Sequence, residues 1–246
     1  MAAIYDTVVL FGDSITQGAW DHGGFGAQLA HAYARRFDVL NRGFSGYNTE
    51  WALPIADTLF PAPGSSVPTA PVRLLTIWFG ANDACLKPSP QHVPLDRFRS
   101  NLHTLIARAP SGAAVVLITA PPVNTIQRGA DLSSRDPPKE LDRSFEVTRQ
   151  YAELVKEVGK EKGVPVVDVW TALWEAVGKE EKRLEEVLSD GLHLNATGYN
   201  ALVETLEREL PELKPEMSWR NFKHPTWDWF SEHGFEGWEE RKKQVP

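Results

Sequence analysis

The stretch TVVLFGDSITQG, residues 7–18, is an apolar run that ends abruptly at a polar turn. Its first half, residues 7–12, has the β-branched and aliphatic composition of a buried strand. Asp13 and Ser14 follow directly, where a strand gives way to a helix. A serine at such a turn is most simply a helix N-cap, and Asp13 is most simply a turn residue. The stretch predicts a strand-to-helix unit with Ser14 at the junction, as a cap, as a nucleophile or as both at once.

The same alternation of apolar runs and helix-like segments continues along the chain. Buried strands are predicted at residues 7–12, 38–43, 72–80, 113–120 and 164–170. Helices are predicted at residues 25–37, 49–59, 95–108, 140–162 and 196–210. Continuously apolar strands suit a parallel sheet that is covered on both faces. The pattern therefore predicts an α/β fold, a three-layer α/β/α sandwich with a five-stranded parallel sheet.

The segments between these elements differ in composition. Pro, Gly and Ser content predicts surface loops at residues 61–71 and 128–140, and the charged residues 179–188 indicate a helical stretch. The chain of 246 residues is 42% hydrophobic, which is enough for one substantial core. We predict one domain at residues 1–210. Residues 211–246 form a Trp-rich extension, expected to pack on this domain or on a neighbouring subunit of a homodimer.

Charge and cysteine content limit the classes of partner. The chain carries 33 acidic and 26 basic side chains, a formal charge of −7, with no long basic stripe, so nucleic acid is not an expected partner. No apolar stretch approaches the roughly 20 residues of a membrane span, so no stable membrane insertion is expected. A single cysteine, Cys85, and a strand-like start without an apolar leader predict a cytoplasmic protein.

Polar clusters follow the predicted strands where their carboxyl ends meet. In open parallel sheets, ligands bind at this edge. Asp190 and His193, in the stretch DGLH, have a spacing that lets the carboxylate reach the imidazole of the same loop. Such an aspartate fixes the imidazole tautomer and leaves Nε2 free to take a proton from a hydroxyl. Alone, this pattern marks an ordinary loop more often than a catalytic pair.

Three further positions supply hydrogen-bond donors at the same edge. Asn82, in GAND, ends the third predicted strand, and Gly46, in SGYN, brings a backbone N–H close to a ligand with no Cβ in the way. Either residue is equally well explained as a turn former. Together with the amide of Ser14 they make the three donors that suit a developing oxyanion.

Several common chemistries lack their motifs. The chain has no G-x-S-x-G elbow, no Walker loop, no complete G-x-G-x-x-G and no usual zinc pattern. Two alternatives to a serine hydrolase stay open. One is a metal-dependent phosphoesterase that uses Asp13, Asp83, Asp190 and His193 as ligands. The other is a non-catalytic binding module on the same fold.

Four ordered blocks, GDS at residues 12–14, Gly46 of SGYN, GAND at 80–83 and DGLH at 190–193, resemble the SGNH (GDSL-type) hydrolase family. The longer strings LFGDSITQG, NRGFSGYNT and DGLHLN are similar to its isoamyl acetate-hydrolysing esterase branch, with Ile15 in place of the leucine of GDSL. The similarity spans about residues 7–210.

This resemblance implies a flavodoxin-like sheet and a serine esterase. Its implied catalytic residues are Ser14 as nucleophile, His193 as base and Asp190 as its orienter, with Ser14, Gly46 and Asn82 in the oxyanion hole. The implied substrates are short-chain esters such as acetates of small alcohols, while thioesters, acylated sugars and lysophospholipids stay open. No metal or cofactor is expected.

Residues around these positions are expected to shape or support the site. Asp13 and Asp83 should brace its loops through backbone hydrogen bonds. Trp20 and Trp51 are candidates for the crevice lining, Trp78 is expected in the core, and His22 in a loop near the entrance. Residues 121–123 are candidates for the acyl or alcohol pocket.

Overall fold

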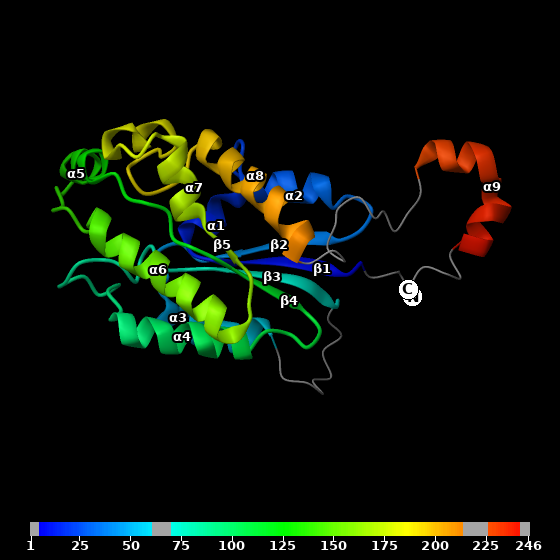
Figure 1. Ribbon diagram of the computed structural model, residues 1–246, viewed down its shortest axis with the longest axis horizontal. Coiled ribbons are helices and arrows are strands. Elements are labelled where there is room, and N and C mark those ends of the chain that lie inside the picture. The colour runs from blue at the N-terminus through cyan, green and yellow to red at the C-terminus, as the bar shows by residue number, and fades with distance from the viewer. Residues whose placement is uncertain (1–4, 61–69, 214–225, 242–246) are drawn as a thin grey trace.

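A parallel five-stranded sheet forms the centre of the molecule (Figure 1). The structure, a computed structural model, describes residues 5–60, 70–213 and 226–241. The strand order is β2-β1-β3-β4-β5. The strands are β1 (Thr7–Gly12), β2 (Asp38–Gly43), β3 (Val72–Trp78), β4 (Ala114–Ile118) and β5 (Val166–Val167). The predicted α/β sandwich with a five-stranded parallel sheet is therefore confirmed.

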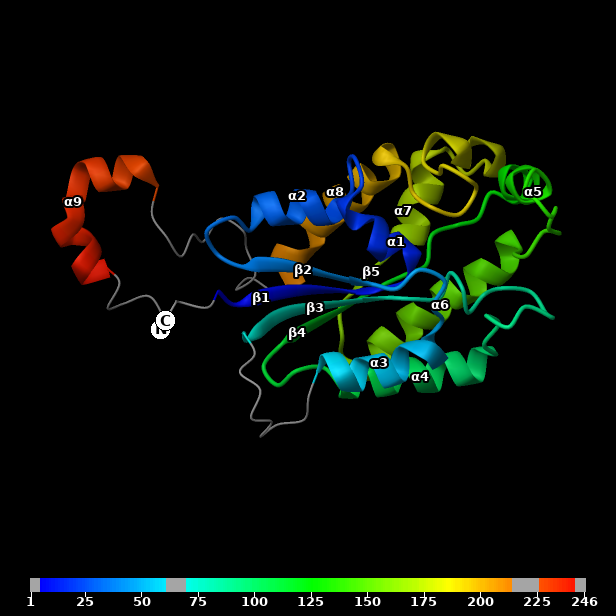
Figure 2. The ribbon, with the colours of Figure 1, turned by 180° about the vertical axis from the view of Figure 1, so that it is seen from behind.

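Helices cover both faces of this sheet. Figures 1 and 2 show α1, α2, α7 and α8 on one face and α3, α4 and α6 on the other, while α5 lies beyond the carboxyl ends of the strands. The helices are α1 (Ser14–Gln17), α2 (Phe25–Ala32), α3 (Thr49–Leu59), α4 (Leu95–Ala107), α5 (Thr125–Ser133), α6 (Phe145–Lys162), α7 (Val169–Ala176), α8 (Ala196–Leu213) and α9 (Trp227–Arg241). Two 3₁₀ helices are η1 (Gly18–Trp20) and η2 (Glu181–Glu186).

The side chains of β1 show why its whole sequence is apolar. Val8 and Leu10 belong to the core cluster on the α2 and α8 side, whereas Val9 and Phe11 belong to the cluster on the α3, α4 and α6 side. All four are buried, because a central strand of a three-layer fold has no solvent-facing side. Trp78 at the end of β3 is also buried, as predicted, and its Nε1 donates to the Thr119 carbonyl over 2.9 Å.

Two predicted element assignments are wrong. Residues 164–170 are not one strand: β5 ends at Val167, because Asp168 accepts from the Thr171 amide at 3.0 Å and caps α7. Residues 128–140 are not a loop throughout, since α5 extends to Ser133. The Asn124 side chain caps this helix by accepting from the Gln127 amide at 3.0 Å, and its buried face holds it against the body.

Other element boundaries differ from their predictions by smaller amounts. The helix predicted at 25–37 ends at Ala32, and the helix predicted at 140–162 begins only at Phe145. The charged stretch 179–188 contains the 3₁₀ helix η2, a tighter turn than the helix predicted there. Part of the predicted loop 61–71 lies outside the described residues.

The carboxyl-terminal extension contains α9, which has no buried residue and lies apart from the sheet in Figures 1 and 2. Trp219 lies outside the described residues. The domain boundary at residue 210 and the packing of the extension stay predictions. In the part of the chain that the structure describes, every helix is too short or too polar to traverse a lipid bilayer.

Candidate active site

The loops at the carboxyl ends of the strands bring Ser14, His193 and Asp190 into one line. Ser14 Oγ lies 2.9 Å from His193 Nε2, although the two residues are 179 positions apart in the sequence. His193 Nδ1 lies 2.9 Å from Asp190 Oδ2. With the Nδ1 proton on the aspartate side, Nε2 is free to accept the hydroxyl proton of Ser14. The arrangement can therefore activate a serine.

Asp190 is held in place on both of its oxygens. Oδ1 accepts from the backbone amides of Leu192 and His193, at 3.0 and 2.8 Å. Oδ2 accepts from His193 Nδ1 and from the guanidinium of Arg128, the latter at 2.8 Å. Partial burial alone raises the pKa of Asp190, but the hydrogen bonds and charge of His193 outweigh it and hold the pKa well below its usual range. Asp190 is thus ionised at neutral pH.

Asp13, rather than Ser14, is the N-cap of α1. Its Oδ1 accepts from the Ile15 amide at 2.9 Å, and Ser14 is the first residue of the helix. The prediction of Ser14 as a cap is therefore wrong, because the Asp13 side chain accepts from the free N–H of Ile15. The Ser14 hydroxyl bonds to His193 instead.

Gly46 and Asn82 lie together at the ends of β2 and β3. Asn82 Nδ2 donates to the Tyr47 carbonyl at 2.9 Å, and Gln91 Nε2 donates both to the Gly46 carbonyl at 2.7 Å and to Asn82 Oδ1 at 3.2 Å. Gly46 has φ +79°, a left-handed conformation that favours glycine. Within residues 5–60 and 70–213, the backbone amides of Ser14 and Gly46 donate to no protein acceptor. These amides and the second Asn82 N–H are the donors predicted to receive an oxyanion.

Asp13 and Asp83 are buried beside the site and bond to backbone amides. Asp83 Oδ1 accepts from the amide and the hydroxyl of Thr49, which is the first residue of α3. Burial raises the pKa of Asp13 to about 6 and that of Asp83 to about 7. Both side chains are where loop-bracing residues would be, and that role stays a prediction.

The four side chains of the alternative metal site do not form one cluster. Asp13 bonds to a backbone amide of α1 and Asp83 to one of α3, whereas Asp190 pairs with His193 and Arg128. Among the described residues, no group of three or more His, Cys, Asp or Glu side chains has the arrangement of a metal site.

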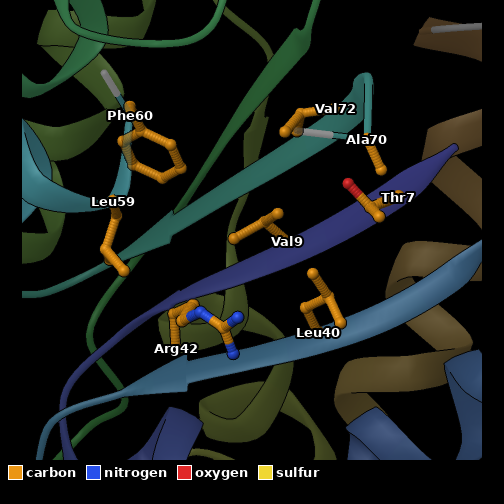
Figure 3. Close-up of a pocket in the computed structure, with 8 residues that line it drawn as sticks. All are labelled: Thr7, Val9, Leu40, Arg42, Leu59, Phe60, Ala70 and Val72. Carbon is orange, nitrogen blue, oxygen red and sulfur yellow. The ribbon is translucent and has the colours of Figure 1, made fainter. Parts of the chain in front are cut away.

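The remaining predicted residues surround the site less closely. His22 is exposed in the loop before α2, and residues 121–123 are buried directly after β4. Trp20 and Trp51 are 47% and 40% exposed, and the lining role expected for them stays a prediction. A pocket of about 220 Å³ lies elsewhere, between β1, β2 and the end of α3, with walls that include Leu40, Phe60 and Arg42 (Figure 3). None of the candidate catalytic residues lines it.

Sequence reasoning missed three residues that bond to the site. Arg128 pairs with Asp190, Arg143 Nη2 donates to Asn82 Oδ1 at 2.8 Å, and Gln91 joins Asn82 to Gly46. Arg128 stood inside a predicted surface loop, where a buried role was not expected. No local pattern marks these residues. Arg128 and Arg143 are 62 and 61 positions from their partners, and Gln91 bonds both to Asn82, nine positions away, and to Gly46, 45 positions away.

A parallel sheet with serine, histidine and carboxylate aligned at its carboxyl edge is typical of ester hydrolases, and comparisons with known proteins place the chain in that class. Residues 10–201 match the model of the GDSL-like Lipase/Acylhydrolase family. A GDSL esterase/lipase of Arabidopsis thaliana is 37% identical over 228 residues, which cover 88% of this chain and 91% of that protein. The chain is a carboxylic ester hydrolase that belongs to the GDSL-like lipase/acylhydrolase family.

Two further relatives resemble the chain over most of its length. The isoamyl acetate-hydrolyzing esterase 1 homolog of Mus musculus is 37% identical over 232 residues, 89% of this chain and 86% of that protein. The crystal structure of a lipase/acylhydrolase from Enterococcus faecalis superposes with a TM-score of 0.63 at 28% identity, and covers 84% of this chain and 96% of that one.

Proposed function

We propose that the protein hydrolyses small carboxylic esters with short acyl groups, such as acetates of small alcohols, through an acyl-enzyme on Ser14. The observation that carries the proposal is the hydrogen-bonded line from Ser14 Oγ through His193 to Asp190, with both distances at 2.9 Å. The preference for a small acetate ester is supported by the likeness to the mouse relative, an isoamyl acetate-hydrolyzing esterase 1 homolog.

Acylation begins at the Ser14 hydroxyl. His193 Nε2 accepts the hydroxyl proton as Oγ attacks the ester carbonyl, and Asp190 stabilises the imidazolium that forms. The carbonyl oxygen becomes an oxyanion that accepts from the amides of Ser14 and Gly46 and from the Asn82 side chain. When the tetrahedral intermediate collapses, the C–O bond to the alcohol breaks and His193 returns the proton to the leaving alkoxide.

Deacylation repeats this route with water. His193 takes a proton from a water molecule, whose oxygen attacks the acyl carbonyl on Ser14. The second tetrahedral intermediate expels Ser14 Oγ, which regains its proton from the imidazolium. The products are a carboxylic acid and an alcohol, and the residues of the chain return to their starting state.

Labelling with a fluorophosphonate probe, read out by intact mass in the presence of a chelator, tests the nucleophile. We expect one adduct on the wild type and on Ser100→Ala, which removes an exposed hydroxyl on α4, but none on Ser14→Ala. Ser14→Ala should also abolish ester turnover while its circular dichroism spectrum is unchanged. Wild-type-like turnover in Ser14→Ala would exclude the proposed acyl-enzyme.

A panel of substrates tests the proposed ester class. We expect kcat/KM to be highest for acetates of small alcohols and to fall as the acyl chain lengthens. Thioesters, acylated sugars and lysophospholipids complete the panel. A higher kcat/KM for any of these would replace the substrate class without changing the mechanism, whereas saturable binding without turnover would favour the binding-module alternative.

A further inference from the structure

Two arginine side chains are buried behind the candidate site. Arg128 on α5 is 6% exposed, and Arg143, just before α6, is 2% exposed. A guanidinium is costly to bury unless its N–H groups are paired with charged or polar acceptors. The partners of these two residues therefore indicate what the buried charges do.

Arg128 divides its donors among three carboxylates. Its Nη1 lies 2.8 Å from Asp190 Oδ2, the oxygen that also accepts from His193. Its Nε and Nη2 lie 3.3 and 3.2 Å from the two oxygens of Asp142, and Asp131 lies 3.4 Å from Nη1 at the outer side. This planar fork fixes the orientation of Arg128 and, through it, of the Asp190 carboxylate.

Asp142 continues the network to the other half of the site. Its Oδ2 pairs with Nη1 of the adjacent Arg143. Arg143 then donates from Nη2 to Asn82 Oδ1 and from Nε to the Ala81 carbonyl, each at 2.8 Å. Because Asn82 Oδ1 accepts from Arg143, its amide nitrogen is turned away from the guanidinium, toward Tyr47 and the site.

We infer that Arg128, Asp142 and Arg143 are positioning residues that hold Asp190 and Asn82 in one geometry for catalysis. The inference rests on the proposed function, because it assigns these residues to the same serine mechanism. Alternating charges run continuously from Asp190 through Arg128, Asp142 and Arg143 to the Asn82 amide. A displacement of Asp142 would therefore disturb both the orienter of the base and an oxyanion donor.

Arg128→Met and Arg128→Lys separate charge from geometry. We expect Arg128→Met to lower kcat with KM nearly unchanged, because Asp190 and Asp142 lose the guanidinium that they share. Arg128→Lys keeps the positive charge but should also lower kcat, by about a hundred-fold, because one ammonium cannot bridge Asp190 and Asp142 as the guanidinium does. Arg149→Met, which breaks an exposed pair with Glu146, is the matched control and should change neither quantity.

Asp142→Asn tests the connection between the two halves. It removes the central negative charge with little change in shape, and we expect a lower kcat with KM nearly unchanged. A double-mutant cycle compares Arg128→Lys, Arg143→Lys and the double variant. The increase in activation free energy, calculated from kcat, should be smaller for the double variant than the sum of the two single increases, because each substitution breaks the same network.

Thermal unfolding and probe labelling distinguish the ways in which the inference fails. Variants that fold, as judged by circular dichroism, but have the wild-type kcat would overturn it, and so would additive effects in the double-mutant cycle. Probe adducts on the wild type would still support Ser14 as the nucleophile. Absence of any adduct on folded wild type would instead overturn the proposed function. If Arg128→Met does not fold, the kcat values of Arg128→Lys and Asp142→Asn still test whether these residues position Asp190 and Asn82.

Discussion

Asn82 is fixed before any substrate arrives, because its amide oxygen and nitrogen are both engaged. Oδ1 accepts from Arg143 and Gln91, and Nδ2 donates one hydrogen to the Tyr47 carbonyl. A donor that is already oriented does not have to reorganise when negative charge develops on the substrate. Asn82 should therefore stabilise the transition state and contribute little to the binding of the substrate.

Asn82→Ala should lower kcat by roughly 10²–10³, equivalent to about 3–4 kcal/mol of transition-state stabilisation, with little change in KM. Steady-state kinetics on the best acetate ester measure both quantities. Asn200→Ala, at an exposed position that contacts Gln28, serves as a control with unchanged kinetics. A loss confined to KM would make Asn82 a substrate-binding residue instead.

Asp83 makes the stability of the protein depend on pH near neutrality. Burial raises its pKa from 3.8 to about 7, so the folded state binds more protons than the unfolded state between these values. Stability therefore falls as pH rises through this window, and Asp13, with a pKa of about 6, acts in the same direction. Both contributions favour the folded protein at mildly acid pH.

We expect the wild-type Tm to rise as pH is lowered from 8 to 5, and Asp83→Asn to show a distinctly flatter dependence. The asparagine oxygen still accepts from Thr49, but the group no longer titrates. Scanning calorimetry at several pH values measures both slopes, and Asp96→Asn on α4 is the exposed control. Equal slopes in wild type and Asp83→Asn would show that this carboxyl does not titrate in the window.

At the level of single residues, the sequence indicates the side chains that stand in short motifs. Asp190 and His193 are three positions apart, and Ser14 and Asn82 lie two and four positions after the ends of β1 and β3, so local spacing and strand ends indicate all four. Arg128 is 62 positions from Asp190, and Arg143 is 61 from Asn82. Such pairings depend on how α5 and the segment before α6 pack against the strand ends, which no local pattern encodes.

Between elements, the contact that matters most for the site is that of α5 with the loop of Asp190 and His193. The Asn124 amide donates to the Gly191 carbonyl at 3.0 Å, and Gly191 has φ +82°. A Cβ on Gly191 would lie 2.5 Å from the Arg128 backbone nitrogen and 2.6 Å from the Asn124 carbonyl oxygen. Only glycine lets the loop approach the start of α5 this closely.

Gly191→Ala should therefore lower both stability and kcat. Gly112→Ala is the matched control, because Gly112 has a similar φ of +80° but nothing within 4 Å of an added Cβ. We expect Gly112→Ala to cost about 1 kcal/mol from backbone strain and Gly191→Ala to cost roughly 1–3 kcal/mol more from the clash. Urea unfolding and kcat measure the difference, and equal effects of the two variants would contradict it.

Composition predicts the central strands and misses the ends of short segments that a cap defines. β1 is buried throughout and β3 is buried from Leu74 onward, so their apolar residues indicate both strands. β5 and α7 form one apolar stretch, and only the Asp168 cap divides it. In α5, the glycine and serines indicated a loop, whereas the burial of Arg128 and Leu132 sustains a helix.

At the scale of the whole molecule, helices cover both faces of the central sheet, whereas α9 in the extension has no buried residue. Among the described residues, Trp227 and Phe235 of α9 are 80% and 83% exposed. Aromatic side chains within α9 contact each other, with Trp229 stacked on His233 at 4.5 Å between ring centroids and Phe230 tilted against Trp238. Exposed aromatic surface of this kind usually marks a contact with other protein surface.

Truncation after Leu213, which keeps α8 complete and removes residues 214–246 of the extension, tests where this aromatic surface packs. We expect it to pack on its own domain, so the truncated protein should unfold at a lower temperature, by about 2–4 °C for each kcal/mol of lost contact, at unchanged molar mass. If the extension joins two subunits, light scattering will show a dimer that truncation converts to a monomer. Equal Tm and equal mass in both proteins would contradict both arrangements, because covering apolar surface on either partner must stabilise the folded state.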